Sequence, residues 1–189
     1  MTQSTRAPSA RRDELLERAY RYAIRRGLAD LSLRPLAAAI DSSPRVLLFL
    51  FDSKEGLVRA LLARARKDEL ALLERSRAEG VEVGVSGAVA VMWRWLSADE
   101  HRPLLALWLE AYALSLVQPA GPWAGFARQT VEDWLAVLAE AQSTTCRRSD
   151  AGVAERTLAL AVLRGALLDL LATGDLARAT AAVDRYVNG

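Results

Sequence analysis

Apolar residues recur every three to four positions along most of the chain, which is the spacing of one buried stripe on an α-helix. The first segment shows this spacing at Leu15, Leu16, Ala19, Tyr22 and Ala23. Apolar and polar residues alternate only over 81–85, a run too short to predict a strand. Ala and Leu, both strong helix formers, supply 67 of the 189 residues. The pattern therefore predicts an all-α fold.

Residues that start, stop or cap helices set the expected boundaries. Gly27 is suited to end the first helix, and Ser43 with Pro44 to begin the third. Asp41 stands where the turn between the second and third helices usually has a glycine, and aspartate tolerates left-handed backbone. These two short helices and their turn predict a helix-turn-helix motif, whereas polar residues 143–152 predict a mobile loop. We expect helices over 10–26, 33–40, 44–51, 54–78, 85–97, 99–117, 122–142, 153–173 and 175–187.

Charge is distributed unevenly along the chain. The formal net charge is +2, but residues 1–67 carry a net +7 and residues 68–189 a net −5. Such an asymmetry indicates that the first part of the chain meets a polyanion.

The scarcity of metal-binding and nucleophilic side chains argues against catalysis. The chain has one Cys, Cys146, and one His, His101, which excludes a disulfide framework, a cysteine-rich or histidine-based metal site and a pair of catalytic imidazoles. The sequence has no Gly-rich phosphate loop, no secretory signal and no apolar stretch long enough to span a bilayer. We therefore expect a cytoplasmic protein that is not an enzyme, with no cofactor, no metal and no membrane partner.

Residues 31–62, LSLRPLAAAIDSSPRVLLFLFDSKEGLVRALL, resemble the TetR family of bacterial transcriptional regulators. In that family an aromatic residue closes the third helix and a Ser-Lys-Glu type start opens the fourth, as Phe51 and residues 53–55 do here. The resemblance covers roughly residues 10–65 and implies an all-α fold of nine helices. It also implies a DNA-binding domain over 10–53, a connecting helix over 54–78, and a ligand-binding and dimerisation domain over 79–189. Residues 1–9 themselves indicate a disordered basic arm before these domains.

Candidate DNA contacts cluster around the third helix. Arg45 can grip guanine O6 and N7 together, which is the commonest specific contact in the major groove. The family's frequent Leu-Tyr-His-His-Phe run stands here as residues 47–51, Leu-Leu-Phe-Leu-Phe, so polar contacts are fewer and apolar side chains could contact thymine methyl groups. We expect Leu47 and Phe51 in the core, and leave Leu48 and Phe49 open between core and surface. The expected DNA contacts are Arg34, Ser42, Ser43, Arg45, Val46, Phe49 and Lys54, with a solvated basic face as the alternative for the charged residues.

The five Trp residues all lie between residues 93 and 134. Small-molecule sites are mostly apolar with a few polar groups, and the resemblance implies that an inducer binds in this region. The alternative is that these aromatic side chains fill a helical core, and that Glu110 pairs with Arg94 or Arg128 rather than with a ligand. The expected pocket residues are Trp93, Leu96, Trp108, Glu110, Tyr112, Phe126 and Trp134.

Residues 158–172 predict a helix that is apolar around most of its circumference and must be covered on two sides. One side can face its own subunit and the other a second copy, since symmetric dimers are the commonest oligomers. The resemblance implies a four-helix bundle across a two-fold axis. The expected dimer contacts are Leu160, Ala161, Arg164, Gly165, Leu168 and Leu171.

Together with the resemblance, these features predict a ligand-responsive transcriptional regulator. We expect a repressor that a small apolar or aromatic effector releases from a palindromic operator in double-stranded DNA. The apolar run over 47–51 leaves a second possibility, a helical ligand-binding protein with weak or non-sequence-specific DNA binding. An enzyme is the least favoured alternative, because only His101 could activate a nucleophile.

Overall fold

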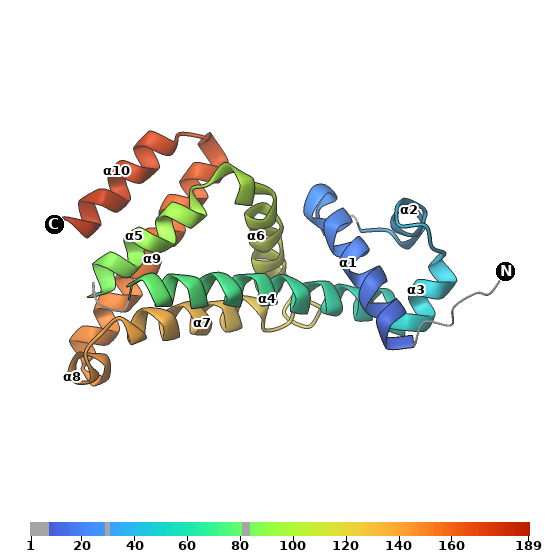
Figure 1. Ribbon diagram of the computed structural model, residues 1–189, viewed down its shortest axis with the longest axis horizontal. Helices are drawn as coiled ribbons and strands as arrows, with labels where there is room; N and C mark the ends of the chain where they lie inside the picture. The colour runs from blue at the N-terminus through green and yellow to red at the C-terminus, as the bar shows by residue number, and fades with distance from the viewer. Residues whose placement is uncertain (1–7, 29–30, 81–83) are drawn as a thin grey trace. The chain divides into compact units, whose positions relative to one another are not determined.

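The computed structural model describes residues 8–28, 31–80 and 84–189, and the regular elements in these ranges are all helical (Figure 1). The predicted all-α fold is confirmed. The described ranges hold ten α-helices, one more than predicted, and a short 3₁₀ helix. Of the predicted arm over 1–9, residues 1–7 lie outside the described residues, and the last two already belong to the first helix. The helices are α1 (Pro8–Arg26), α2 (Leu33–Ala39), α3 (Pro44–Phe51), α4 (Lys54–Gly80), α5 (Gly84–Leu96), η1 (Asp99–His101), α6 (Arg102–Val117), α7 (Phe126–Glu140), α8 (Thr144–Arg148), α9 (Asp150–Thr173) and α10 (Leu176–Val187).

The chain forms two compact units. The first unit comprises residues 1–67 and 106–127, and the second comprises residues 68–105 and 128–189. Helices α4, α6 and α7 each contribute residues to both units. Across the described ranges, no helix combines the length and the apolarity needed to cross a membrane.

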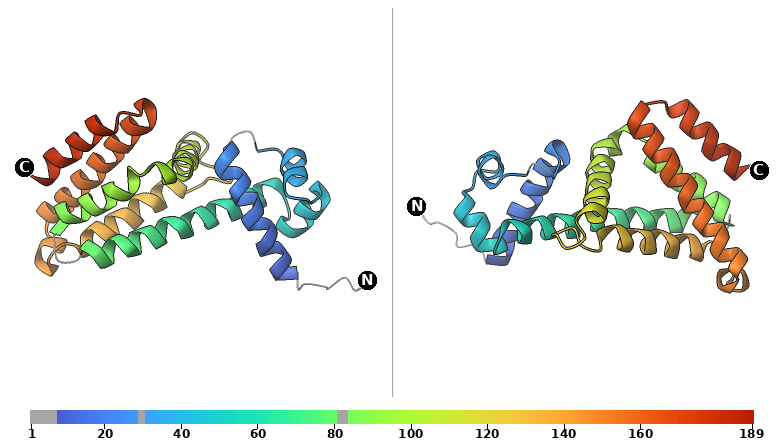
Figure 2. Two further views of the ribbon diagram at one scale, coloured as in Figure 1. Left: turned by 45° about the horizontal axis from the view of Figure 1, so that its top comes forward. Right: turned by 180° about the vertical axis from the view of Figure 1, so that it is seen from behind.

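In the first unit, α2 and α3 lie beside α1 (Figure 2), and hydrogen bonds join the turn between them to α1. The guanidinium of Arg18 in α1 donates to the carbonyl of Ile40 at 2.7 Å and to the carboxylate of Asp41 at 2.9 Å. Asp41 has a φ of 53°, so the predicted left-handed turn without glycine is confirmed. Arg64 of α4 pairs with Glu17 of α1, which joins the fourth helix to the same group. The turn of the helix-turn-helix is thus held by α1, and α1 in turn is joined to α4.

The helix ends in this unit follow the capping signals in the sequence. Gly27 ends α1 with a φ of 83°, and the Ser43 hydroxyl accepts a hydrogen bond from Val46 N at 3.3 Å at the start of α3. The Ser53 hydroxyl caps α4 by accepting from Gly56 N at 2.9 Å. A Cβ at Gly56 would lie 2.0 Å from the carbonyl oxygen of Phe51, so the close approach of α3 to α4 requires glycine.

In the second unit, α5, α9 and α10 pack against one another (Figure 1). The indole Nε1 of Trp93 in α5 donates to the hydroxyl of Thr180 in α10 at 3.0 Å. Buried residues of all three helices, such as Val89, Leu163 and Val183, supply the core between them.

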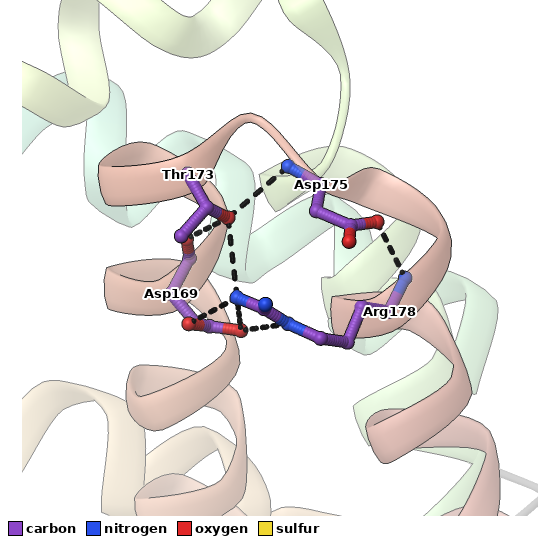
Figure 3. Close-up of polar contacts among 4 residues, drawn as sticks. All are labelled: Asp169, Thr173, Asp175 and Arg178. Carbon is purple, nitrogen blue, oxygen red and sulfur yellow. Dashed lines mark hydrogen bonds and ion pairs between the residues drawn. The ribbon is translucent and has the colours of Figure 1, made fainter.

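A polar corner joins α9 to α10 (Figure 3). The guanidinium of Arg178 grips both carboxylate oxygens of Asp169, with Nη2 at 2.7 and 2.8 Å and Nε at 3.0 Å. Asp175 caps α10 by accepting from Arg178 N at 3.0 Å, and Thr173 Oγ1 accepts from Asp175 N at 3.1 Å. The hydrogen bonds to Asp169 raise the pKa of Arg178 from its ordinary value.

Two predicted helices begin later than expected. The helix expected over 99–117 starts with the 3₁₀ helix η1 before α6, because Pro103 has no N–H to bond to residue 99 and its ring crowds that carbonyl. The helix expected over 122–142 begins at Phe126, because Gly125 has a φ of 76° and interrupts a helical path.

The prediction of a mobile loop over 143–152 is wrong. Ser143 accepts from Cys146 N at 3.2 Å and starts α8, and Ser149 accepts from Gly152 N at 3.0 Å and starts α9. A Cβ at Gly152 would lie 1.9 Å from the carbonyl oxygen of Cys146, so α8 and α9 touch through backbone atoms there. The capping serines make a segment of polar composition helical.

Candidate nucleic-acid interface and ligand site

The surface of α3 is largely apolar. Leu47 and Phe51 are 1% and 3% exposed, which confirms their expected place in the core. By contrast, Val46 is 38%, Leu48 41% and Phe49 81% exposed. Leu48, which the sequence left open, therefore lies at the surface. Phe49 stands nearly free in solvent, an unusual place for a large apolar side chain.

The expected basic contacts around this helix are exposed. Arg45 is the one charged residue in α3, Arg34 lies in the first turn of α2, and Lys54 opens α4. Arg12 of α1 contacts the end of α3. Its Nε donates to the carbonyl of Leu50 at 3.3 Å, and its guanidinium lies 4.9 Å from the centre of the Phe51 ring.

The two serines before α3 are placed differently from each other. The Ser43 oxygen accepts a hydrogen bond from the first turn of α3, which leaves its hydroxyl hydrogen available for another acceptor. The Ser42 hydroxyl is shielded from solvent and has no hydrogen-bond partner. A contact from Ser42 to DNA stays a prediction, and it requires that side chain to turn outwards.

The expected pocket residues are divided between the two units. Trp108, Glu110, Tyr112 and Phe126 belong to the first unit, and Trp93, Leu96 and Trp134 to the second. The three Trp, Leu96 and Phe126 are buried, while Glu110 and Tyr112 are half-buried. In the first unit the rings of Trp108 and Tyr112 lie 5.4 Å apart at a tilt of 32°. A pocket that these residues share stays a prediction.

Glu110 of α6 makes a contact that the sequence did not suggest. Its Oε2 accepts a hydrogen bond from the backbone N–H of Leu28 at 2.7 Å, just beyond the end of α1. A Cβ at Gly27 would lie 3.1 Å from the same oxygen. Glu110 is thus a fastening point between α6 and the α1–α2 connection within the first unit. The two partners are 82 positions apart, so no local pattern could reveal the contact.

The outer face of α9 carries a stripe of small and apolar residues. Leu158, Ala161, Gly165 and Leu168 are exposed, and they follow the alternating three- and four-residue spacing that helices use to pack against each other. Nothing lies within 4 Å of a Cβ built at Gly165. Leu160 is 4% exposed and covered by its own subunit, so it does not belong to this face, whereas Leu158, which was not among the expected contacts, does. Arg164 and Leu171 are half-buried beside the stripe.

His101 and Cys146 take part in local structure. The His101 ring stacks on Trp95 with ring centres 3.8 Å apart, and its Nδ1 lies 2.9 Å from the Trp95 carbonyl oxygen. His101 is half-buried. The Cys146 thiol lies 3.7 Å from the Glu155 carboxylate. Among the described residues, no three His, Cys, Asp or Glu side chains gather as a metal site would require.

Comparison with known proteins gives matches among solved structures only. No family model matches the chain, and no curated protein matches it. The multidrug binding protein EbrR, complexed with imidazole, is 25% identical over 93% of this chain and 89% of that chain, with a TM-score of 0.67. The same protein complexed with proflavin is 26% identical, covers 93% and 98% of the two chains, and has a TM-score of 0.66. A TetR-family transcriptional regulator from Agrobacterium tumefaciens is 16% identical over 96% of this chain and 97% of that chain, with a TM-score of 0.73.

Proposed function

We propose that this chain, which has the fold of the TetR-family transcriptional regulators, is a ligand-responsive DNA-binding regulator of transcription. In this proposal it is a repressor, and a small apolar or aromatic effector releases it from a palindromic operator. The observation that carries the proposal is the helix-turn-helix of α2 and α3, with Arg45 exposed on its second helix and with α1 and α4 supporting it. The proposed DNA-binding domain is residues 10–53, with 54–78 as connector and 79–189 as the ligand-binding and dimerisation domain.

Charge and exposure support DNA as the partner of this motif. Residues 1–67 carry a net charge of +7, and Arg34, Arg45 and Lys54 are exposed around α3. A guanidinium in the first turn of a recognition helix can reach base edges, and Lys54 in the first turn of α4 is suited to a phosphate. We propose that Ser42, Ser43, Val46 and Phe49 complete this contact surface.

The proposed effector follows from the aromatic residues. Five Trp lie between residues 93 and 134. The three of them that we expect in the pocket, Trp93, Trp108 and Trp134, are buried. A site with these side chains fits a flat apolar molecule, and Glu110 would favour a cationic one. The structures of EbrR hold imidazole and proflavin, so proflavin is a reasonable first probe for this chain. Trp fluorescence titrated with proflavin in the absence of DNA tests this part of the proposal.

The exposed stripe on α9 supports a two-fold dimer. Small residues at Ala161 and Gly165 allow a second helix to approach closely, and Leu158 and Leu168 supply apolar surface on either side. A two-fold dimer presents two copies of α3, so a palindromic operator with half-sites about one turn of DNA apart is expected.

The decisive experiment is a footprint on the promoter DNA of the chain's own gene. We expect protection of one palindromic site, and a double variant Arg45→Ala with Lys54→Ala that binds this site at least about tenfold more weakly. The control variant Arg148→Ala with Arg185→Ala removes two exposed guanidinium groups from α8 and α10 and should bind as the parent does. Unchanged affinity in the Arg45 and Lys54 variant would remove these residues from the interface. Absence of a protected site anywhere in the genomic DNA would refute the regulator.

A second candidate function is a ligand-binding protein of the same fold with weak or non-sequence-specific DNA binding. The exposure of Leu48 and Phe49 favours it, because most of α3 offers no hydrogen bonds to DNA. This candidate predicts steep salt dependence without any preferred sequence, or no DNA binding at all.

A further inference from the structure

We propose that α3 reads its DNA half-site mainly through thymine methyl groups, with Arg45 as its one hydrogen-bonding base contact. The proposal rests on the proposed function and names the sequence class that the recognition helix selects: a G·C pair with thymines beside it. The observation behind it is the combination of a guanidinium and three exposed apolar side chains on the outer face of a helix without acidic residues.

The helix geometry places these side chains together. Successive residues of an α-helix are turned by about 100°, so Arg45 and Phe49, four positions apart, lie one above the other on the same face. Val46 and Leu48 flank that line on its two sides. Leu47 and Phe51 point the opposite way and are buried, which fixes the rotation of the helix in the unit. The exposed face of α3 therefore carries Arg45 and Phe49 in one line along the helix, with Val46 on one side of that line and Leu48 on the other.

The chemistry of the major groove leaves one apolar target. The four base pairs present donors and acceptors there, and the C5-methyl of thymine is the single apolar group among them. Adenine is usually recognised by Asn or Gln and cytosine by a carboxylate, and α3, with the sequence PRVLLFLF, has none of these residues. Guanine matches Arg45, and thymine methyl groups match Val46, Leu48 and Phe49.

Charge favours DNA over a protein as the partner of this apolar face. Arg34, Arg45 and Lys54 are exposed around it, and no acidic residue occurs between Asp41 and Asp52. A phosphate backbone on either side of the groove would meet these cations while the apolar side chains meet the bases. Contact would also remove the Phe49 ring from water, which is favourable in proportion to the area buried.

The spacing of the two central side chains sets the register of the half-site. Four residues of helix rise about 6 Å, and base pairs are stacked about 3.4 Å apart. A recognition helix that follows the groove therefore brings Phe49 to a thymine about two base pairs from the guanine that Arg45 contacts.

Replacement of thymine by deoxyuridine tests the proposal directly. Deoxyuridine pairs with adenine and keeps the O4 acceptor, so it differs from thymidine only by the C5-methyl group. The operator is first defined by footprinting, and each thymine in it is then replaced one at a time. We expect about fourfold weaker binding at each contacted thymine, which corresponds to one buried methyl group. Replacements outside the half-sites should have no effect.

Protein variants identify which side chain contacts which methyl group. Phe49→Ala should bind the unmodified operator more weakly and should no longer distinguish thymine from uracil at one position. Leu116→Ala removes an exposed apolar side chain from α6 and is the matched control, with the discrimination of the parent chain. Circular dichroism verifies that both variants are folded.

The outcomes separate this inference from the proposed function. Specific binding that is indifferent to uracil at every thymine refutes methyl readout and leaves the regulator intact. If Phe49→Ala, Val46→Ala and Leu48→Ala all still distinguish thymine from uracil as the parent chain does, the assignment of the methyl contacts to α3 is refuted. Absence of any preferred sequence refutes both proposals.

Discussion

The contact between Glu110 and the α1–α2 connection allows a quantitative prediction. The carboxylate accepts from Leu28 N at 2.7 Å, and Leu28 itself is buried. Hydrogen bonds to charged groups contribute about 1.5–3 kcal/mol to stability. Glu110→Ala removes this acceptor, so we expect the free energy of unfolding to fall by about that amount. Glu110→Gln keeps an oxygen acceptor without the charge and should lose about half as much.

Gly27 provides an independent check on the same contact. Its φ of 83° costs a residue with a side chain about 1–2 kcal/mol, and a Cβ would lie 3.1 Å from Glu110 Oε2. Gly27→Ala should therefore cost more in the parent chain than in the Glu110→Ala background, where only the backbone strain remains. The difference between the two costs is the coupling of the two residues.

Urea unfolding followed by far-ultraviolet circular dichroism measures five chains: the parent, Gly27→Ala, Glu110→Gln, Glu110→Ala, and the double variant of Gly27→Ala with Glu110→Ala. The expected order of stability is parent, Glu110→Gln, Glu110→Ala, then the double variant with Gly27→Ala. Equal free energies of unfolding for the parent and Glu110→Ala would show that the Glu110 carboxylate does not stabilise the fold. Strictly additive effects of Gly27→Ala and Glu110→Ala would show that the Cβ and the carboxylate do not compete for space.

Further substitutions test other parts of the fold. Gly56→Ala should lower both stability and DNA affinity, because its Cβ would lie 2.0 Å from the Phe51 carbonyl oxygen; thermal unfolding and a gel-shift assay measure the two losses. Gly152→Ala should destabilise α8 and α9, with a Cβ 1.9 Å from a carbonyl oxygen of α8, and an unchanged melting temperature would contradict this packing. Gly165→Leu should convert the proposed dimer into folded monomers in analytical ultracentrifugation, since the subunit leaves open space at that position. Burial raises the pKa of Tyr186 from its ordinary value of 10.0, so above about pH 10 the folded chain keeps a proton that the unfolded chain loses. The stability of the parent chain should therefore fall above this pH, and the stability of Tyr186→Phe should fall less steeply.

The helix-turn-helix could be predicted from the sequence because its determinants are local. Asp41 in the turn, Ser43 as cap and Pro44 at the first position of α3 act within a few residues of themselves, and the structure confirms the turn and the cap. The buried positions of α3, Leu47 and Phe51, lie four residues apart, as helical periodicity requires. Its exposed apolar residues conflicted with that periodicity, so the sequence could not assign Leu48.

Long-range contacts and weak composition signals explain what the sequence did not predict. The bond between Glu110 and Leu28 joins segments that meet only in the folded chain. Residues 143–152 are rich in Ser, Thr and Arg, which is typical of a loop, yet Ser143 and Ser149 each start a helix. Each of these two serines accepts a hydrogen bond from the backbone N–H three residues later, an N-cap that polar composition alone does not reveal.

The near absence of charge from α3 has a consequence for how binding responds to salt. Each phosphate neutralised by a cation releases counterions and makes affinity fall with salt concentration. Apolar contacts release none, and excluded salts such as sulfate strengthen them. Arg45 is the one charge on α3, so the base-reading part of the proposed interface would add little to that fall. Most of it would come from Arg34, Lys54 and the other basic residues, which specific and non-specific complexes would share. Raising the salt concentration should therefore weaken binding to operator and random DNA alike, while the ratio of the two affinities changes little. The chain would then discriminate sequences well even where its overall affinity is low.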